Sequence, residues 1–203
     1  MEKTNKQFFK DLVLAPSPSG FEQPAQEIYR NFVKPYADDV KTDVHGNVIA
    51  FRKGSGNVRL MFSGHADEIG LMINYIDANG FLRFKPIGGI DAGILPGLRV
   101  NVYHKGKKLR GVIGKKPIHL LKPEDRKHAA KISDLWIDIG AKDKKDAEKK
   151  VAIGDPVTFD MGMDTINGNI ISTKATDNKV GVFVCGAVLK ELHGEDISAN
   201  IYS

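Results

Sequence analysis

The chain contains the stretch Leu60-Met61-Phe62-Ser63-Gly64-His65-Ala66-Asp67-Glu68-Ile69-Gly70, in which an apolar strand pattern runs directly into His-x-Asp. Side chains two residues apart in an extended segment point the same way, so we expect Asp67 to lie beside His65. A carboxylate in that position fixes which ring nitrogen of the histidine is available to a metal ion. The stretch therefore predicts a strand whose end carries part of a metal site.

A second candidate ligand lies more than a hundred residues later, in Lys174-Ala175-Thr176-Asp177-Asn178-Lys179-Val180-Gly181. Asp177 stands just ahead of an apolar helical run that we expect over 177–192, with Gly194 placed to end it. An aspartate in this place also suits an N-cap, which accepts a hydrogen bond from an amide of the first turn. That structural role is compatible with metal binding, and a backbone hydrogen bond alone could equally explain His65.

The segments that flank these motifs have an α/β pattern. Helices are expected from a capping box at Thr4-Asn5-Lys6-Gln7 to about residue 15, and over 23–34. A hairpin is expected over 40–51 and a central strand over 58–64. The α/β pattern returns at Ile170.

From Ile69 to about residue 165 the pattern changes to short strands separated by glycine. Strands are expected over 71–76, 81–86, 99–104, 109–114, 135–139 and 156–159, with short helices near 123–131 and 144–151. This spacing is typical of a small β-barrel. The chain is therefore predicted to be an α/β protein whose sheet domain, residues 1–68 and 166–203, is interrupted by an inserted β-barrel over 69–165.

Composition indicates an ordinary globular protein. Of 203 residues, 41% are hydrophobic and 27% charged, and no apolar run is long enough for a membrane span. The first ten residues lack the apolar centre of a secretory signal, so we expect a cytoplasmic protein with no membrane contact. The single cysteine, Cys185, lies in an apolar run and is expected to pack as a small hydrophobe.

The formal net charge of +5 raises the question of nucleic-acid binding. The positive runs over 104–110 and 142–150 lack the interleaved aromatic residues on which bases stack, and the second run is mixed with acidic residues. No nucleic-acid motif is present either. The charge is therefore assigned to solvated faces, and no nucleic-acid partner is expected.

In these motifs the chain resembles the metal-dependent aminopeptidases of peptidase family M42. Beside the His65 and Asp177 segments, four stretches match the family in the expected order: residues 14–22 with the turn Pro18-Ser19-Gly20, the hairpin 43–47, Asp134-Leu135-Trp136-Ile137-Asp138-Ile139-Gly140-Ala141, and Gly154-Asp155-Pro156-Val157. The resemblance covers the entire chain, and the order of several motifs is far more specific than one His-x-Asp.

The resemblance implies an enzyme that hydrolyses N-terminal residues from peptides through a water activated by two divalent metal ions, zinc or cobalt. It implies that His65 binds one metal, that Asp177 bridges both, and that Asp67 contributes to catalysis by supporting the histidine. In related dinuclear peptidases the peptide bond after the bridging aspartate is cis, which here is Asp177–Asn178.

The resemblance also carries expectations about assembly. The sheet domain would be the catalytic domain, and the inserted barrel would be a PDZ-like dimerisation domain. The expected partners are peptide substrates and further copies of the chain, as dimers that assemble into larger cages.

One part of the family pattern is missing from residues 1–203. The family places an adjacent pair of glutamates, one of them the general base, and then an aspartate and a histidine ligand after the segments matched here. We therefore expect an incomplete catalytic domain, the N-terminal portion of a longer enzyme, inactive by itself.

Two other hypotheses stay open. The chain could be a non-catalytic assembly module whose barrel dimerises, or a related metallohydrolase that acts on acyl-amino acids or small amides. Glycoside hydrolysis is not expected, because no pair of carboxylates is placed for it.

Overall fold

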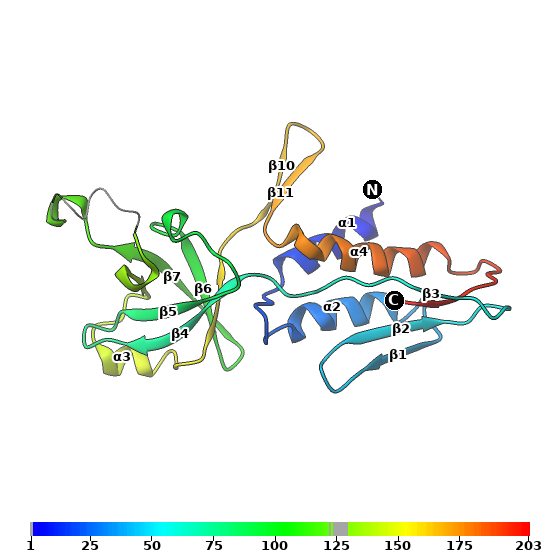
Figure 1. The fold of residues 1–203 in the computed structure, drawn as a ribbon, viewed down its shortest axis with the longest axis horizontal. Coiled ribbons are helices and arrows are strands. Elements are labelled where there is room, and N and C mark those ends of the chain that lie inside the picture. Colours follow the sequence, from blue (N-terminus) through cyan, green and yellow to red (C-terminus); the bar gives the residue numbers. More distant parts are fainter. Residues whose placement is uncertain (1, 122, 124–129) are drawn as a thin grey trace. The chain divides into compact units, whose positions relative to one another are not determined.

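The computed structural model describes residues 2–121, 123 and 130–203 (Figure 1). The chain divides into two compact units, one made of Met1–Glu68 with Gly162–Ser203 and the other of Ile69–Met161. Together they give a mixed α/β fold that includes a closed barrel. The helix expected near 123–131 falls mainly on residues 124–129, which lie outside the described part of the chain.

The first unit is built on a four-stranded sheet with the order β1-β2-β12-β3. Its strands are β1 (Asp39–Thr42), β2 (Val48–Arg52), β3 (Arg59–Met61) and β12 (Asn200–Tyr202). Strands β1 and β2 form the expected hairpin, and β12 pairs antiparallel with β2 and parallel with β3. Because β12 lies between β2 and β3, segments from the two ends of the chain share one sheet.

The position of β3 corrects one sequence prediction. A central strand was expected over 58–64, but β3 is shorter and lies at the edge of the sheet. Leu60 and Met61 are accordingly 47% and 71% exposed. An apolar run indicates a strand, whereas its place in the sheet depends on pairing with distant residues.

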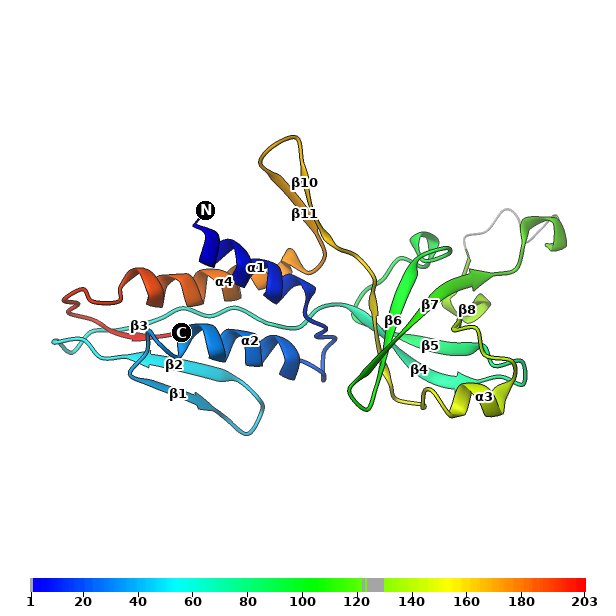
Figure 2. The ribbon, with the colours of Figure 1, turned by 180° about the vertical axis from the view of Figure 1, so that it is seen from behind.

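Three helices lie on one side of this sheet: α1 (Lys3–Leu14), α2 (Gln23–Val33) and α4 (Thr176–Glu191) (Figures 1 and 2). They share an apolar core with β2 and β12, and Cys185 is buried in it, as expected. Pro24 lies in the first turn of α2, where no intrahelical amide donor is needed. The core members from the helices, together with Ala15 directly after α1, are Phe8, Leu12, Ala25, Tyr29, Val33, Val182, Cys185 and Leu189.

The start of α1 differs from the prediction, and the buried face of α4 is one that its sequence did not indicate. Helix α1 begins at Lys3 after Glu2, which makes no side-chain capping bond, so the capping box at Thr4 is wrong. In α4 the buried face carries Val182, whereas Val180 and Val184 are 42% and 45% exposed. Every position from Val180 to Leu189 is apolar or glycine, so contacts with α1 and α2 decide which face is buried.

A hairpin that was not expected leads into α4. It consists of β10 (Met163–Ile166) and β11 (Ile170–Thr173), which pair antiparallel. The turn contains Asn167 and Gly168 with φ of 47° and 81°. Asn-Gly between two apolar segments is a strong hairpin signal, and it was available in the sequence.

The second unit is the closed barrel, with strand order β4-β5-β8-β7-β6-β9. The strands are β4 (Gly70–Ile76), β5 (Leu82–Ile87), β6 (Arg99–His104), β7 (Lys107–Lys115), β8 (Leu135–Asp138) and β9 (Pro156–Phe159). Helix α3 (Lys144–Glu148) is shorter than expected, and the short 3-10 turns are η1 (Ala92–Ile94), η2 (Ile118–Leu120) and η4 (Ile132–Asp134). The predicted small β-barrel is therefore confirmed.

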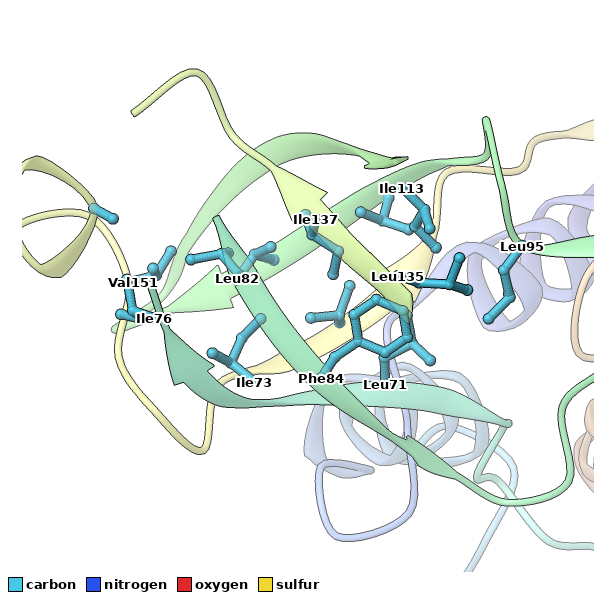
Figure 3. Close-up of a cluster of buried hydrophobic side chains, with 14 residues drawn as sticks. Leu71, Ile73, Ile76, Leu82, Phe84, Leu95, Ile113, Leu135, Ile137 and Val151 are labelled. Carbon is cyan, nitrogen blue, oxygen red and sulfur yellow. The ribbon is translucent and has the colours of Figure 1, made fainter. Parts of the chain in front are cut away.

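The inner face of the barrel holds its apolar core (Figure 3). Along β4, Leu71 and Ile73 alternate inward, and a bulge between Ile73 and Tyr75 then shifts the alternation so that Ile76 is buried and Tyr75 is 51% exposed. Leu82 on β5 pairs with Ile137 on β8, and both are fully buried. These strands close the barrel around a core of buried apolar side chains.

Replacing Leu82 with alanine is expected to lower the free energy of unfolding of the barrel by about 2–5 kcal/mol, because it leaves a cavity in a packed core. Urea denaturation followed by tryptophan fluorescence measures this, since Trp136 lies on β8 of the same unit. Ile153→Ala is the control: Ile153 is 64% exposed, so its loss should cost less than about 0.5 kcal/mol. Equal stability of the two variants would contradict the core assignment.

Within the described residues, no helix combines the length and the apolar character needed to cross a bilayer.

Candidate metal centre

His65 lies in the loop that follows β3, and a glycine sets its position. A Cβ atom on Gly64 would lie 2.6 Å from the amide nitrogen of Val182 and 2.7 Å from the carbonyl carbon of Gly181. Only a residue without a side chain therefore allows the loop to pass this close to the backbone of α4. The close approach places His65 beside the first turns of that helix.

Asp177 lies at the start of α4, where the backbone is not yet helical. Its φ and ψ are −90° and 106°, and the peptide bond from Asp177 to Asn178 is cis, as the resemblance implied. The cap of the regular helix is Asn178, whose Oδ1 accepts a hydrogen bond from the Gly181 amide at 3.1 Å. The carboxylate of Asp177 makes no capping bond and is 96% exposed, so it is accessible to a ligand.

The three residues predicted for the site lie next to one another in the structure. His65 Nδ1 lies 2.8 Å from Asp67 Oδ1, and His65 Nε2 lies 3.3 Å from Asp177 Oδ1. The imidazole is thus held between two carboxylates, one at each ring nitrogen. With Nδ1 engaged by Asp67, Nε2 is the nitrogen directed at Asp177.

Asp67 is held from its other side by Ser19. The Ser19 hydroxyl donates a hydrogen bond to Asp67 Oδ2, while Oδ1 faces His65. The Ser19 hydrogen bond and, after it, the contact with His65 lower the pKa of Asp67 below its usual value. The carboxylate therefore stays ionised at neutral pH, which keeps it a strong acceptor for the imidazole N–H.

The donor set fits a divalent metal ion. Two ligand atoms bound tetrahedrally at about 2.0–2.1 Å from one zinc ion are separated by about 3.3 Å. The 3.3 Å between His65 Nε2 and Asp177 Oδ1 agrees with that separation, and both side chains are accessible, at 56% and 96% exposure. Within the described residues no third histidine, cysteine, aspartate or glutamate joins them, so the set amounts to two ligands.

A cavity of about 450 Å³ adjoins His65 and Asp67 within the same unit. It extends along α2 and toward the turn of the β1–β2 hairpin, where Gln26, Arg30 and His45 line it. A cavity of this volume can hold several amino-acid residues of a ligand beside the imidazole. A ligand at His65 could therefore be reached from solvent.

Sequence reasoning missed several residues around the site. Ser19 was noted only as part of a turn, and Glu68 was given no role. Glu68 is buried, and its carboxylate contacts the amines of Lys174 and Lys179. Burial lowers the pKa of Lys179 to about 8, an effect that the charge of Glu68 opposes. The available signal was a lysine directly before the stretch 180–189, in which every residue is apolar or glycine.

The other described histidines do not join the site. His104 Nδ1 lies 2.9 Å from Asp155 Oδ2 in the barrel, and His193 packs edge-on against the ring of Tyr36. His45 lies in the β1–β2 turn and His119 in η2, both exposed. His128 lies outside the described residues.

Several known proteins are similar to this chain in sequence or in structure. A putative aminopeptidase of Acetivibrio thermocellus is 38% identical over 178 residues, which is 88% of this chain and 51% of the relative. Among solved structures, the TET aminopeptidase of the marine sediment archaeon Thaumarchaeota archaeon SCGC AB-539-E09 superposes with a TM-score of 0.93 at 33% identity, covering 98% of this chain and 56% of that one. The TET1 peptidase of Pyrococcus horikoshii, described as assembling into a tetrahedron or a large octahedral shell, gives 0.88 at 35% identity, with 98% and 59% covered.

The chain thus spans about half the length of the relatives it matches. The family match itself extends over residues 46–203, which includes His65, Asp67, Asp177 and the whole barrel. This is most of the chain, and the structural likeness covers nearly all of it. The chain belongs to the M42 glutamyl aminopeptidase family.

Proposed function

We propose that residues 1–203 supply the first part of the metal centre of an aminopeptidase that removes N-terminal residues from peptides. The observation that carries the proposal is the 3.3 Å separation of His65 Nε2 from Asp177 Oδ1, which suits two ligands of one metal ion. Family membership supports the reaction class. Zinc or cobalt suits this combination of imidazole and carboxylate.

Each side chain has a distinct role in this proposal. His65 would hold one metal ion through Nε2, Asp177 would hold the pair of metals through its carboxylate, and Asp67 fixes the tautomer and direction of the imidazole. When bound, divalent metal at such a site lowers the pKa of water toward neutrality and polarises the substrate carbonyl. The adjoining cavity gives the peptide access to His65.

Catalysis needs more groups than the described residues bring together. Catalytic zinc sites have three protein ligands and an open position, and here His65 and Asp177 supply two, with no general base beside them in the described chain. We infer that the remaining ligands and the base belong to the part of the M42 enzyme that residues 1–203 do not match. Residues 1–203 are accordingly expected to bind metal weakly and to hydrolyse no peptide.

We infer that the barrel is the PDZ-like dimerisation domain of this enzyme. Its surface carries apolar side chains that are more than half exposed, including Ile94, Ile118, Leu120 and Ile153. The related TET1 peptidase is described as able to assemble into a tetrahedron or a large octahedral shell. Self-association through the barrel is therefore the expected partner relationship, with peptides as substrates.

Cobalt binding tests the proposal on residues 1–203 as they stand. Crystals soaked in CoCl₂ should show an anomalous peak about 2 Å from His65 Nε2 and from an Asp177 carboxylate oxygen. A peak only at other residues would overturn the metal-centre proposal and favour the non-catalytic assembly module. A version of the protein that includes the rest of the family pattern should then be assayed on aminoacyl-p-nitroanilides and on acyl-amino acids. Hydrolysis of the first indicates an aminopeptidase and hydrolysis of the second the related metallohydrolase. Hydrolysis that does not depend on metal would contradict both.

Asp67→Asn is expected to weaken cobalt binding by about 10–100-fold, because the amide cannot support the imidazole as an ionised carboxylate does. Titration followed by paramagnetic line broadening in NMR spectra measures weak affinities of this kind. The matched control is Asp43→Asn, which neutralises a carboxylate in the β1–β2 turn of the same unit. Unchanged cobalt affinity in Asp67→Asn would remove Asp67 from the proposed site.

A further inference from the structure

Glu68 is an acidic residue whose side chain is buried next to the candidate metal centre. Its side chain is 4% exposed, and Lys174 Nζ donates to both of its carboxylate oxygens at 2.7 Å. Glu68 Oε1 also accepts a hydrogen bond from the Ser17 amide at 3.0 Å. With both oxygens engaged by protein donors, Glu68 is not available as a metal ligand or a base.

A second lysine completes this cluster. Lys179 is fully buried, its Nζ lies 3.7 Å from Glu68 Oε1, and it donates to the carbonyl oxygen of Ala15 at 2.8 Å. Lys174 is 8% exposed in its side chain. The cluster of Glu68, Lys174 and Lys179 thus lies within the protein, where ion pairs are little screened by solvent.

The cluster connects the two segments that carry the candidate ligands. Glu68 comes three residues after His65, Lys174 comes three residues before Asp177, and Lys179 comes two residues after it. The contacts to Ser17 and Ala15 add the turn that also presents Ser19 to Asp67. Every segment that contributes to the site is therefore tied to one buried carboxylate.

Stability alone does not explain such an arrangement. Desolvation of buried ions offsets much of their attraction, so apolar side chains of similar volume would stabilise this core about as well. What an ion cluster adds is direction, because its hydrogen bonds form in only one arrangement of the backbone segments. Metal ligands need that accuracy, since a site that is loose by even 1 Å binds poorly.

We propose that Glu68, Lys174 and Lys179 are positioning residues that hold the His65 loop and the start of α4 at the separation required by a shared metal ion. This inference rests on the proposed function and concerns residues that touch neither metal nor substrate. It assigns the cluster an effect on metal affinity and ligand-field geometry, beyond any effect on folding.

Glu68→Gln and Lys174→Met test the proposal in residues 1–203, with cobalt alone as the probe. Each variant removes one charge with little change in volume. Each is expected to weaken cobalt binding about tenfold or more, the size of effect found for groups that orient metal ligands, and to change the visible absorption spectrum of the bound cobalt. Because the two residues act through one ion pair, the double variant should bind cobalt no more weakly than whichever single variant has the lower affinity.

The control is Asp155→Asn, which neutralises a largely buried carboxylate paired with His104 in the barrel. It should leave cobalt affinity and spectrum unchanged whatever its effect on stability. If Lys174→Met does not fold, Glu68→Gln, which preserves the shape of the side chain, decides the question. Folded Glu68→Gln with wild-type affinity and spectrum would overturn the positioning role.

The outcome for the wild-type chain separates this inference from the proposed function. If wild-type residues 1–203 bind no cobalt at His65 and Asp177, the metal-centre proposal itself fails. If the wild type binds cobalt there and the variants bind it equally well with the same spectrum, only the positioning role fails.

Discussion

Replacing His65 with alanine is expected to abolish specific cobalt binding by residues 1–203, with a loss of affinity of more than about 100-fold. Loss of a group that merely orients a metal ligand costs about 10–100-fold, and here the ligand itself is removed. Asp177 would be left as the one remaining member of the proposed pair of ligands. The anomalous peak at the site should disappear and the paramagnetic broadening of nearby resonances should be lost.

The fold should be unaffected by this substitution. The His65 side chain is 56% exposed and lies outside the apolar core, so we expect a change in the free energy of unfolding of less than about 0.5 kcal/mol. His193→Ala provides a matched control, since it removes an exposed histidine elsewhere in the same unit. Cobalt that stays bound at Asp177 with wild-type affinity in His65→Ala would show that the imidazole is no ligand.

Replacing Gly64 with alanine is expected to damage both the fold and the site. The new methyl group would lie 2.6 Å from the Val182 amide nitrogen, and the atoms it meets are backbone atoms of α4 that cannot turn aside as a side chain could. Overpacking of this kind costs about 1–3 kcal/mol. Helix α4 must move away from the His65 loop, which also separates His65 from Asp177.

Two measurements on Gly64→Ala should therefore change together. Thermal or urea denaturation should show the loss of stability. Cobalt titration should show at least a tenfold loss of affinity, which is the size of effect found when metal ligands lose their correct orientation. Gly162→Ala is the control, because Gly162 belongs to the same unit and a Cβ there meets nothing within 4 Å. Wild-type stability and affinity in Gly64→Ala would mean that α4 and the loop are not in close contact.

These variants distinguish three ways in which a residue can matter to the same site. His65 would act as a ligand, so its loss removes binding and spares the fold. Gly64 acts through the space that it leaves open, so its loss affects the fold and the binding together. Glu68 is proposed to act through the alignment of two segments, so the spectrum of bound cobalt is its most specific readout.

Much of the fold could be predicted from local pattern. The alternation along β4 and β5, the glycine at the turn before β5, and the proline at the start of α2 report on neighbours within a few residues, and the barrel strands and α2 formed where expected. The hairpin β10–β11 was predictable from Asn167-Gly168 and was missed. In each case the signal and the structure it specifies lie within one short segment.

The candidate site was predictable only in part. The motifs named His65, Asp67 and Asp177, and the spacing of His65 and Asp67 alone predicted their contact, because extended residues two apart share a face. That Asn178 rather than Asp177 caps α4 could not be foreseen, since either residue type suits that position.

What the sequence by itself determined is the set of local elements and the residue types able to hold a metal. The tertiary structure alone decided that β3 is an edge strand, that α4 buries Val182 rather than Val180, and that Glu68 meets Lys174 across 106 positions of sequence. The physical reason is that local preferences depend on a residue and its near neighbours. The distance between His65 and Asp177 depends on how β3, β12 and α4 pack, which is a property of the whole unit.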